Sequence, residues 1–90
     1  MPTLHLLIKG KVQGVFYRAT ARDVAKEIGI TGWIKNTKEE DVEAVASGNN
    51  EQLARFANWC RQGPATASVT EVIVTTWEDE DFKDFRIIRD

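Results

Sequence analysis

Nine residues near the amino terminus combine two glycines and an arginine in an order that suits the binding of an anion. Residues 10–18 read Gly-Lys-Val-Gln-Gly-Val-Phe-Tyr-Arg and join a predicted strand to a predicted helix. Unpaired main-chain N–H groups and the helix dipole favour an anion at such a junction, and glycine lets successive N–H groups turn toward one phosphate oxygen. Arg18 adds a planar, permanently charged group that matches phosphate geometry. The segment predicts a phosphate site, with an ordinary turn carrying a surface arginine as the alternative.

Asn36 is the second candidate, because it ends a strand predicted at residues 31–36. In the sheet inferred below, the carboxyl end of this strand approaches the loop after the first strand. A carboxamide can hold a water through its carbonyl and its NH₂ group together, and it does not repel an incoming phosphate as a carboxylate does. Asn36 is therefore a candidate for holding a water. The alternative is a turn residue at a hairpin entrance, the commonest role of Asn.

Seven elements must position these residues. Strand patterns occupy five segments, namely residues 4–9 closed by Gly10, 31–36, 42–47, 69–77 and 85–89. Two amphipathic helix patterns follow, one over residues 21–28 after a loop at 11–18, and one after the capping pair Asn49 and Gln52 that ends before Gly63. The order βαββαβ with a further terminal strand predicts an α+β, ferredoxin-like plait, in which an antiparallel sheet carries both helices on one face.

Length and composition exclude several other classes. Ninety residues at 10.2 kDa suffice for one compact domain, so we expect residues 1–90 to form a single unit. Cys60 has no second cysteine for an internal disulfide, and with His5 it cannot complete a structural zinc site. No apolar run reaches the ~18 residues of a membrane span, and the first residues lack the zones of a signal peptide, so we expect a cytoplasmic protein.

Charge is distributed unevenly along the chain. Residues 1–38 carry seven Lys and Arg against two acids, whereas residues 39–90 carry five against twelve. An excess of positive charge in the first half is compatible with a local anion site there, and solvated surface charge is the alternative reading. The sequence pI near 5.4 is not typical of a general nucleic-acid binder.

These motifs resemble the acylphosphatase family. The first family motif matches residues 10–18 at every fixed position, as Gly-x-Val-Gln-Gly-Val-x-Tyr-Arg. The second is largely matched by Gly-Trp-Ile-Lys-Asn at residues 32–36 followed by Val-Glu at residues 42–43, and residues 63–69 fit a further family segment. The resemblance extends from about residue 4 to residue 89, which is nearly the whole chain.

The resemblance implies metal-free hydrolysis of carboxyl-phosphate bonds, with Arg18 as the phosphate-binding arginine and Asn36 as the water-orienting asparagine. It implies a phosphate-binding set made of Gln13, Gly14, Val15, Phe16, Tyr17 and Arg18. We expect no cofactor and no metal ion. The expected partner is a small acyl phosphate, with inorganic phosphate or sulfate as a site ligand, and we expect a monomer without nucleic-acid or membrane partners.

Such chemistry needs few groups. An acyl phosphate expels a carboxylate whose conjugate acid has a pKa near 4, so no general acid is required, and an oxygen of the substrate's own phosphate is our candidate for the proton acceptor. One departure concerns the hairpin after Asn36, where Glu39 and Glu40 replace the family's usual Asp-Gly. Glycine supplies positive φ without steric cost, so its absence predicts a different or a strained turn and puts the placement of Asn36 in question.

Other readings of the same sequence remain. The plait could be an anion-binding module without turnover, an RNA-binding module, or a relative of the carbamoyl-phosphate-processing domain of a hydrogenase maturation protein. RNA binding calls for exposed aromatic residues on the central strands, and residues 4–9 and 41–47 contain no Phe, Tyr or Trp. We expect Cys60 to be a core residue, His5 to be structural or solvated, and the acidic run at residues 78–81 to be a solvated loop.

Overall fold

Seven elements follow one another along the chain, and the computed structural model describes residues 1–89. They are β1 (Thr3–Lys11), α1 (Tyr17–Ile28), β2 (Thr31–Asn36), β3 (Val42–Ser47), α2 (Asn50–Gln62), β4 (Ser68–Trp77) and β5 (Phe85–Ile87). The strands form one sheet in the order β4-β1-β3-β2-β5. The predicted order of elements is confirmed, including the adjacency of β1 and β3.

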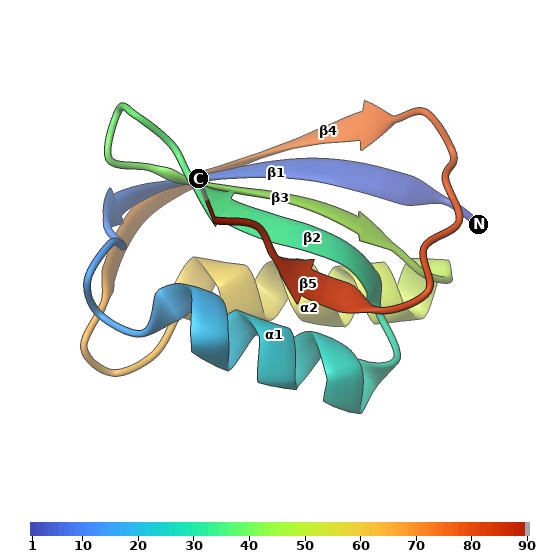
Figure 1. The fold of residues 1–90 in the computed structure, drawn as a ribbon, viewed down its shortest axis with the longest axis horizontal. Helices are drawn as coiled ribbons and strands as arrows, with labels where there is room; N and C mark the ends of the chain where they lie inside the picture. Colours follow the sequence, from blue (N-terminus) through green and yellow to red (C-terminus); the bar gives the residue numbers. More distant parts are fainter. Residues whose placement is uncertain (90) are drawn as a thin grey trace.

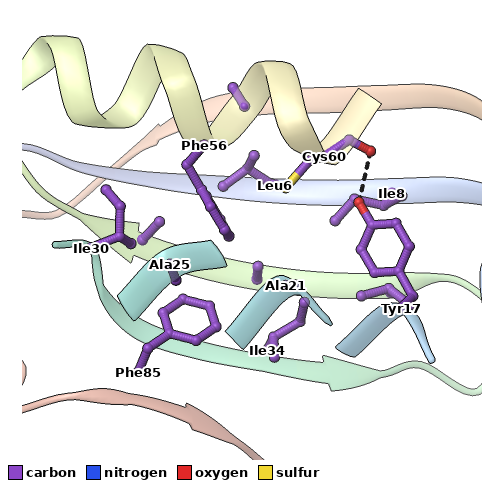
Figure 2. Packing of buried hydrophobic residues seen from close by; sticks show 14 of the residues in the cluster. Leu6, Ile8, Tyr17, Ala21, Ala25, Ile30, Ile34, Phe56, Cys60 and Phe85 are labelled. Carbon is purple, nitrogen blue, oxygen red and sulfur yellow. Dashed lines mark hydrogen bonds between the residues drawn. The ribbon is translucent and has the colours of Figure 1, made fainter. Parts of the chain in front are cut away.

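Both helices cover the same face of the sheet, so the molecule has two layers (Figure 1). Side chains between the layers form the core, which includes Leu6 and Ile8 from β1 and Ile34 from β2 (Figure 2). The rings of Phe56 on α2 and Phe85 on β5 meet edge to face, with centroids 5.6 Å apart. Burial of these apolar surfaces is the main force that holds the helices on the sheet. The expected ferredoxin-like plait is confirmed.

The predicted bounds of β2 and β3 are also those of the structure, and α2 begins at its predicted cap. Asn49 Oδ1 accepts a hydrogen bond from the Gln52 N–H, and Gln52 Oε1 accepts one from the Asn49 N–H, both at 2.8 Å. This reciprocal pair satisfies two main-chain donors at the start of the helix. Neither helix among residues 1–89 is long and apolar enough to cross a membrane.

Gly10 does not close the first strand, contrary to the sequence-based expectation. β1 continues to Lys11, and its pairing with β4 shifts by one residue between Lys9 and Gly10, which is a β-bulge. Gly10 has φ 126°, and a Cβ atom there would lie 2.2 Å from the carbonyl oxygen of Ser68. A residue without a Cβ atom is therefore needed at position 10 because β4 approaches β1 closely there.

β5 extends the sheet at the free edge of β2. The two strands run parallel, with Ile34 opposite Ile87, so the sheet is mixed at this edge. The N–H of Ile88 donates to the carbonyl of Ile34 at 2.8 Å, which prolongs the pairing past the end of β5. The sequence predicted a short terminal strand but not its direction, and this pairing brings the last residues to the same end of the molecule as the carboxyl end of β2.

Candidate active site

A cavity of about 270 Å³ lies where four segments meet at one end of the sheet. The loop after β1, the start of α1, the end of β2 and the residues after β5 gather at this end of the molecule (Figure 1). The lining residues are Val12, Gly14, Phe16, Tyr17, Arg18, Ala19, Asn36, Ile87 and Arg89. The cavity brings together both predicted catalytic residues, Arg18 and Asn36. Four of the six predicted phosphate-binding residues line it, whereas Gln13 and Val15 do not.

The amino terminus of α1 borders this cavity and has no side-chain cap. Phe16 precedes the helix in the left-handed conformation, with φ 63°, and no acidic residue stands in the first turn. The first main-chain bond of the helix is that of the Thr20 N–H to the Phe16 carbonyl, at 3.1 Å. Among residues 1–89, none of the main-chain N–H groups of residues 13–18 donates a hydrogen bond. Unsatisfied donors at a helix amino terminus are the elements of an anion site.

Arg18 lies in the first turn of α1. The sequence-based expectation placed Arg18 in the loop before the helix. This is wrong, because α1 begins at Tyr17, one residue before Arg18. Its side chain is partly exposed and lines the cavity. Within residues 1–89 no carboxylate lies within ion-pair distance of Arg18. The guanidinium is therefore available to an external anion.

Asn36 is the last residue of β2 and pairs with Val42 of β3. Its Oδ1 atom is buried and accepts no hydrogen bond from any residue in the described chain. A buried acceptor without a partner costs free energy, of the order of 1–3 kcal/mol, and such groups in folded proteins call for an explanation. Because Asn36 also lines the cavity, a water molecule there is a suitable donor to this oxygen.

The side chain of Gln13 ties the loop to the β2–β3 hairpin. Its Nε2 group donates to the carbonyl of Thr37 at 3.0 Å and to that of Asp41 at 2.8 Å. Thr37 follows Asn36 directly, so these bonds fix the loop that precedes Arg18 against the end of the strand that carries Asn36. The side-chain amide of Gln13 thus bonds to the protein itself, and it supports the site by holding the loop in place.

The hairpin turn is strained, which is one of the two outcomes expected from the sequence. Glu40, one of the two residues that replace Asp-Gly, has φ 67°, a conformation that a non-glycine residue adopts at a cost. The turn is nevertheless closed by bonds between Thr37 and Asp41, in which the Thr37 N–H donates to the Asp41 carbonyl at 2.9 Å. Lys9 Nζ lies 3.0 Å from Asp41 Oδ2 and links the turn to β1.

Tyr17 anchors the first turn of α1 in the core. Its hydroxyl donates to the carbonyl of Cys60 on α2 at 2.7 Å (Figure 2). Burial raises the pKa of the Tyr17 phenol far above its usual value, and burial likewise raises the pKa of the Cys60 thiol to about 12. Both groups stay protonated at neutral pH, so neither acts as a nucleophile or base. The prediction that Cys60 is a core residue is confirmed.

Ile87 and Arg89 are lining residues that the sequence analysis did not identify. The alternating pattern of residues 85–89 was the available signal, because Phe85, Ile87 and Arg89 share one side of that strand. Assigning Ile87 and Arg89 to the cavity also requires the pairing partner and the direction of β5, and the alternating pattern gives neither. Among the described residues, Arg89 also has no carboxylate within ion-pair distance.

His5 lies outside the cavity, in a cluster on the sheet face opposite the helices. Its Nε2 atom lies 2.6 Å from Glu43 Oε2, and its ring stacks on Trp77 with centroids 5.0 Å apart. These are structural contacts between β1, β3 and β4, in line with the expectation for His5. Residues 1–89 contain no group of three or more His, Cys, Asp or Glu side chains arranged to hold a metal ion.

A two-layer α+β sandwich whose cavity combines unpaired amides, an arginine and a buried carboxamide defines a small phosphate-handling domain. A family model described as Acylphosphatase matches residues 4–87. The acylphosphatase of Marinobacter nauticus is 46% identical over 83 residues, which are 91% of this chain and 90% of that protein. The chain belongs to the acylphosphatase family.

Solved structures agree with this assignment. An acylphosphatase structure from Coxiella burnetii superimposes with a TM-score of 0.93 at 39% identity, and the match covers 97% of this chain and 92% of that one. The acylphosphatase structure from Bacillus subtilis gives a TM-score of 0.95 at 29% identity, and the match covers 99% of this chain and 100% of that one. The whole fold, and not an isolated motif, is therefore shared with members of the family.

Proposed function

We propose that this chain hydrolyses acyl phosphates in the cavity between α1 and β2, with Arg18 and the main-chain amides of the Gln13–Arg18 loop holding the phosphate and Asn36 orienting the attacking water. Acyl phosphate hydrolysis is the activity that family membership gives the chain. One observation carries the assignment of roles: a single cavity is lined by Arg18, by Gly14, Phe16 and Tyr17 with their unpaired amides, and by Asn36, whose Oδ1 has no partner.

The phosphate half of the substrate is held electrostatically. Arg18 offers two parallel N–H donors to two phosphoryl oxygens, and the amides at the start of α1 offer further donors with the favourable end of the helix dipole behind them. Charge on the phosphoryl group spreads over its oxygens as the bond to the acyl group lengthens. Donors fixed in advance around those oxygens stabilise that charge without reorganisation. We expect this electrostatic stabilisation to supply most of the rate acceleration.

The water is held by the carboxamide of Asn36. One water O–H donates to Oδ1, and the NH₂ group can donate to the water oxygen, which leaves a lone pair directed at phosphorus. In ideal intramolecular cases, fixing two reacting groups in this way lowers a barrier by about 7–11 kcal/mol. Asn36 needs no change of charge for this task, so it acts at any pH at which the substrate is intact.

The bond changes balance without a further group. The water oxygen forms a bond to phosphorus, and the bond from phosphorus to the acyl oxygen breaks, so that the carboxylate leaves with the bonding pair. The proton of the water passes to a phosphoryl oxygen of the substrate. The products are the carboxylate and inorganic phosphate. Because the leaving group is a weak base, no acid has to protonate it.

We also propose that the chain acts as a single domain and as a monomer, since one copy supplies every group in this scheme. We place the enzyme in the cytoplasm, where a lone buried thiol such as Cys60 stays reduced. A small acyl phosphate is then its only required partner, and inorganic phosphate is expected to bind as a product.

Release of phosphate from benzoyl phosphate in the presence of EDTA tests the proposal. We expect turnover by the wild type, and losses of about 10²–10³-fold in kcat/KM for Arg18→Ala and Asn36→Ala. Arg22→Ala is the matched control, because Arg22 lies one turn further along α1 and pairs with Asp23. Near-normal turnover by either site variant would contradict the assignment of that residue. Circular dichroism would establish that the variants are folded.

A further inference from the structure

The chain after β5 brings a second arginine to the candidate active site. β5 pairs with β2 in parallel, with Ile87 opposite Ile34, and the bond from the Ile88 N–H to the Ile34 carbonyl continues the pairing. Extending that register by two residues sets Arg89 alongside Asn36. Arg89 accordingly lines the same cavity as Arg18.

Alternation along this segment directs its residues to opposite faces of the sheet. Phe85 is only 2% exposed in the core, and Ile87 and Arg89 follow on the same side and line the cavity. Arg86 and Ile88 belong to the other face, where they border a different hollow beside Trp33. Arg89 lies two residues past the end of β5, and its place at the cavity agrees with a continuation of this alternation.

The charges around the cavity are unbalanced. Arg86 is neutralised by Asp84, whose Oδ1 lies 2.8 Å from Arg86 Nε. Arg18 and Arg89 have no such partner among residues 1–89, although both border a cavity of only about 270 Å³. Two like charges that border one small cavity repel each other, and anions bound between them remove that repulsion.

The proposed mechanism uses only one of these two charges. The phosphoryl group already has Arg18 and the amides at the start of α1 as donors. Besides Arg18 and Arg89, the lining includes the apolar side chains of Val12 and Ile87, and it includes Phe16, which is 78% exposed. A cavity lined by apolar side chains and by two cationic groups is complementary to a molecule that has a hydrocarbon part and two anionic groups.

We propose that Arg89 is a specificity-determining residue that binds a second anionic group, at the far end of the acyl chain, and so selects acyl phosphates that carry one. This inference rests on the proposed function, since it assigns the second half of the same substrate. Arg89 contributes through the acyl group and not at the reacting phosphorus, so its effect is a preference among substrates.

Three substrates that share a rigid benzoyl phosphate core test the proposal: benzoyl phosphate itself, 3-carboxybenzoyl phosphate and 4-carboxybenzoyl phosphate. The last two carry a second anionic group at different positions on the ring. We expect the wild type to favour at least one carboxylated substrate over benzoyl phosphate by about tenfold in kcat/KM, mainly through KM, as for a charge-assisted hydrogen bond. The ratio should fall to about 1 in Arg89→Ala and below 1 in Arg89→Glu. Arg86→Ala, on the same segment but facing away, should keep the wild-type ratio.

The outcomes separate the two proposals. If the wild type hydrolyses none of the three substrates, the proposed function is overturned. If it hydrolyses them and favours neither carboxylated substrate, or if Arg89→Ala keeps the preference or lowers all three rates by the same factor, the assignment of Arg89 is overturned while the hydrolase proposal stands. A preference that weakens equally in Arg86→Ala would likewise contradict it, since general loss of positive charge would then explain the effect.

Discussion

The two helices begin in opposite ways. α2 starts with the reciprocal bonds of Asn49 and Gln52, which satisfy two main-chain donors, and it has Glu51 in its first turn, whose charge complements the helix dipole. α1 starts after Phe16, which offers no capping oxygen, and its first turn contains no acid and one arginine, Arg18. The capped start of α2 is the arrangement that helix stability alone favours.

The difference indicates which end is reserved for a ligand. An uncapped amino terminus forgoes about 1 kcal/mol of helix stability. At α1 that loss is compensated by packing, in which Tyr17 is buried and its hydroxyl is bonded to α2. The open donors then remain for an anion, whereas two of the main-chain donors at the start of α2 are occupied by the side chains of Asn49 and Gln52. The comparison predicts that changes at α1 affect activity and that changes at α2 affect stability.

The largest expected effect comes from Arg18→Lys. Lysine keeps the charge but cannot offer two parallel donors, so we expect kcat/KM for benzoyl phosphate to fall by about 10²-fold while the free energy of unfolding changes little. Steady-state kinetics and urea denaturation measure the two quantities. A lysine variant as active as the wild type would show that charge alone is needed at α1.

Asn49→Ala gives the reverse pattern. Loss of the capping bonds should lower the free energy of unfolding by about 1 kcal/mol and leave kcat/KM unchanged, because α2 does not border the cavity. Asn49→Ser, which restores a capping oxygen, should recover most of the stability. An effect of Asn49→Ala on kcat/KM at temperatures where the protein is fully folded would break the division between the two helices.

Phe16→Asp makes α1 resemble α2 by adding a carboxylate at its amino terminus. The new charge competes with phosphate for the same donors, so we expect KM for the substrate and the inhibition constant of inorganic phosphate to rise about fivefold, which corresponds to about 1 kcal/mol. Phe16→Asn is the control, since Asn tolerates the left-handed conformation equally but carries no charge. Equal effects of Asp and Asn would point to the lost ring and away from the helix terminus.

The smallest expected effect concerns the hairpin beside the site. Glu40→Gly removes the strain at φ 67° but adds freedom to the unfolded chain, so the net gain in unfolding free energy should be below about 1 kcal/mol. We expect kcat/KM to stay within about twofold, because Gln13 fixes the hairpin whichever residue occupies the turn. A larger change in activity would mean that the strained turn itself sets the position of Asn36.

Much of the fold follows from local patterns. The period of the apolar residues and the pair Asn49 and Gln52 suffice to predict β2, β3 and the start of α2, because each of these signals acts within one element. The meeting of Arg18 with Asn36 also follows, since β1 and β2 both pair with β3 and their connected loops share one end of the sheet. The amino-acid sequence therefore suffices to predict that both residues lie at the same end of the sheet, and the family resemblance adds the prediction of their roles.

The remaining features depend on contacts between distant segments. Gly10 forms a bulge against Ser68, and no local pattern indicates which strand comes so close. The direction of β5 depends on which edge of the sheet is free, so Ile87 and Arg89 could not be assigned to the cavity. The side chain of Gln13 was expected among the phosphate-binding residues, and only the hairpin carbonyls in the folded chain reveal its second role.

The bonds from Gln13 to both ends of the hairpin have a consequence for how the enzyme responds to heat. They link the loop that precedes Arg18 to the strand end that carries Asn36. Both bonds come from one partly buried side chain, so loss of its order on heating removes both at once. We therefore expect turnover to decline on heating before the sheet and helices unfold, which activity assays and far-UV circular dichroism on the same heating ramp would measure.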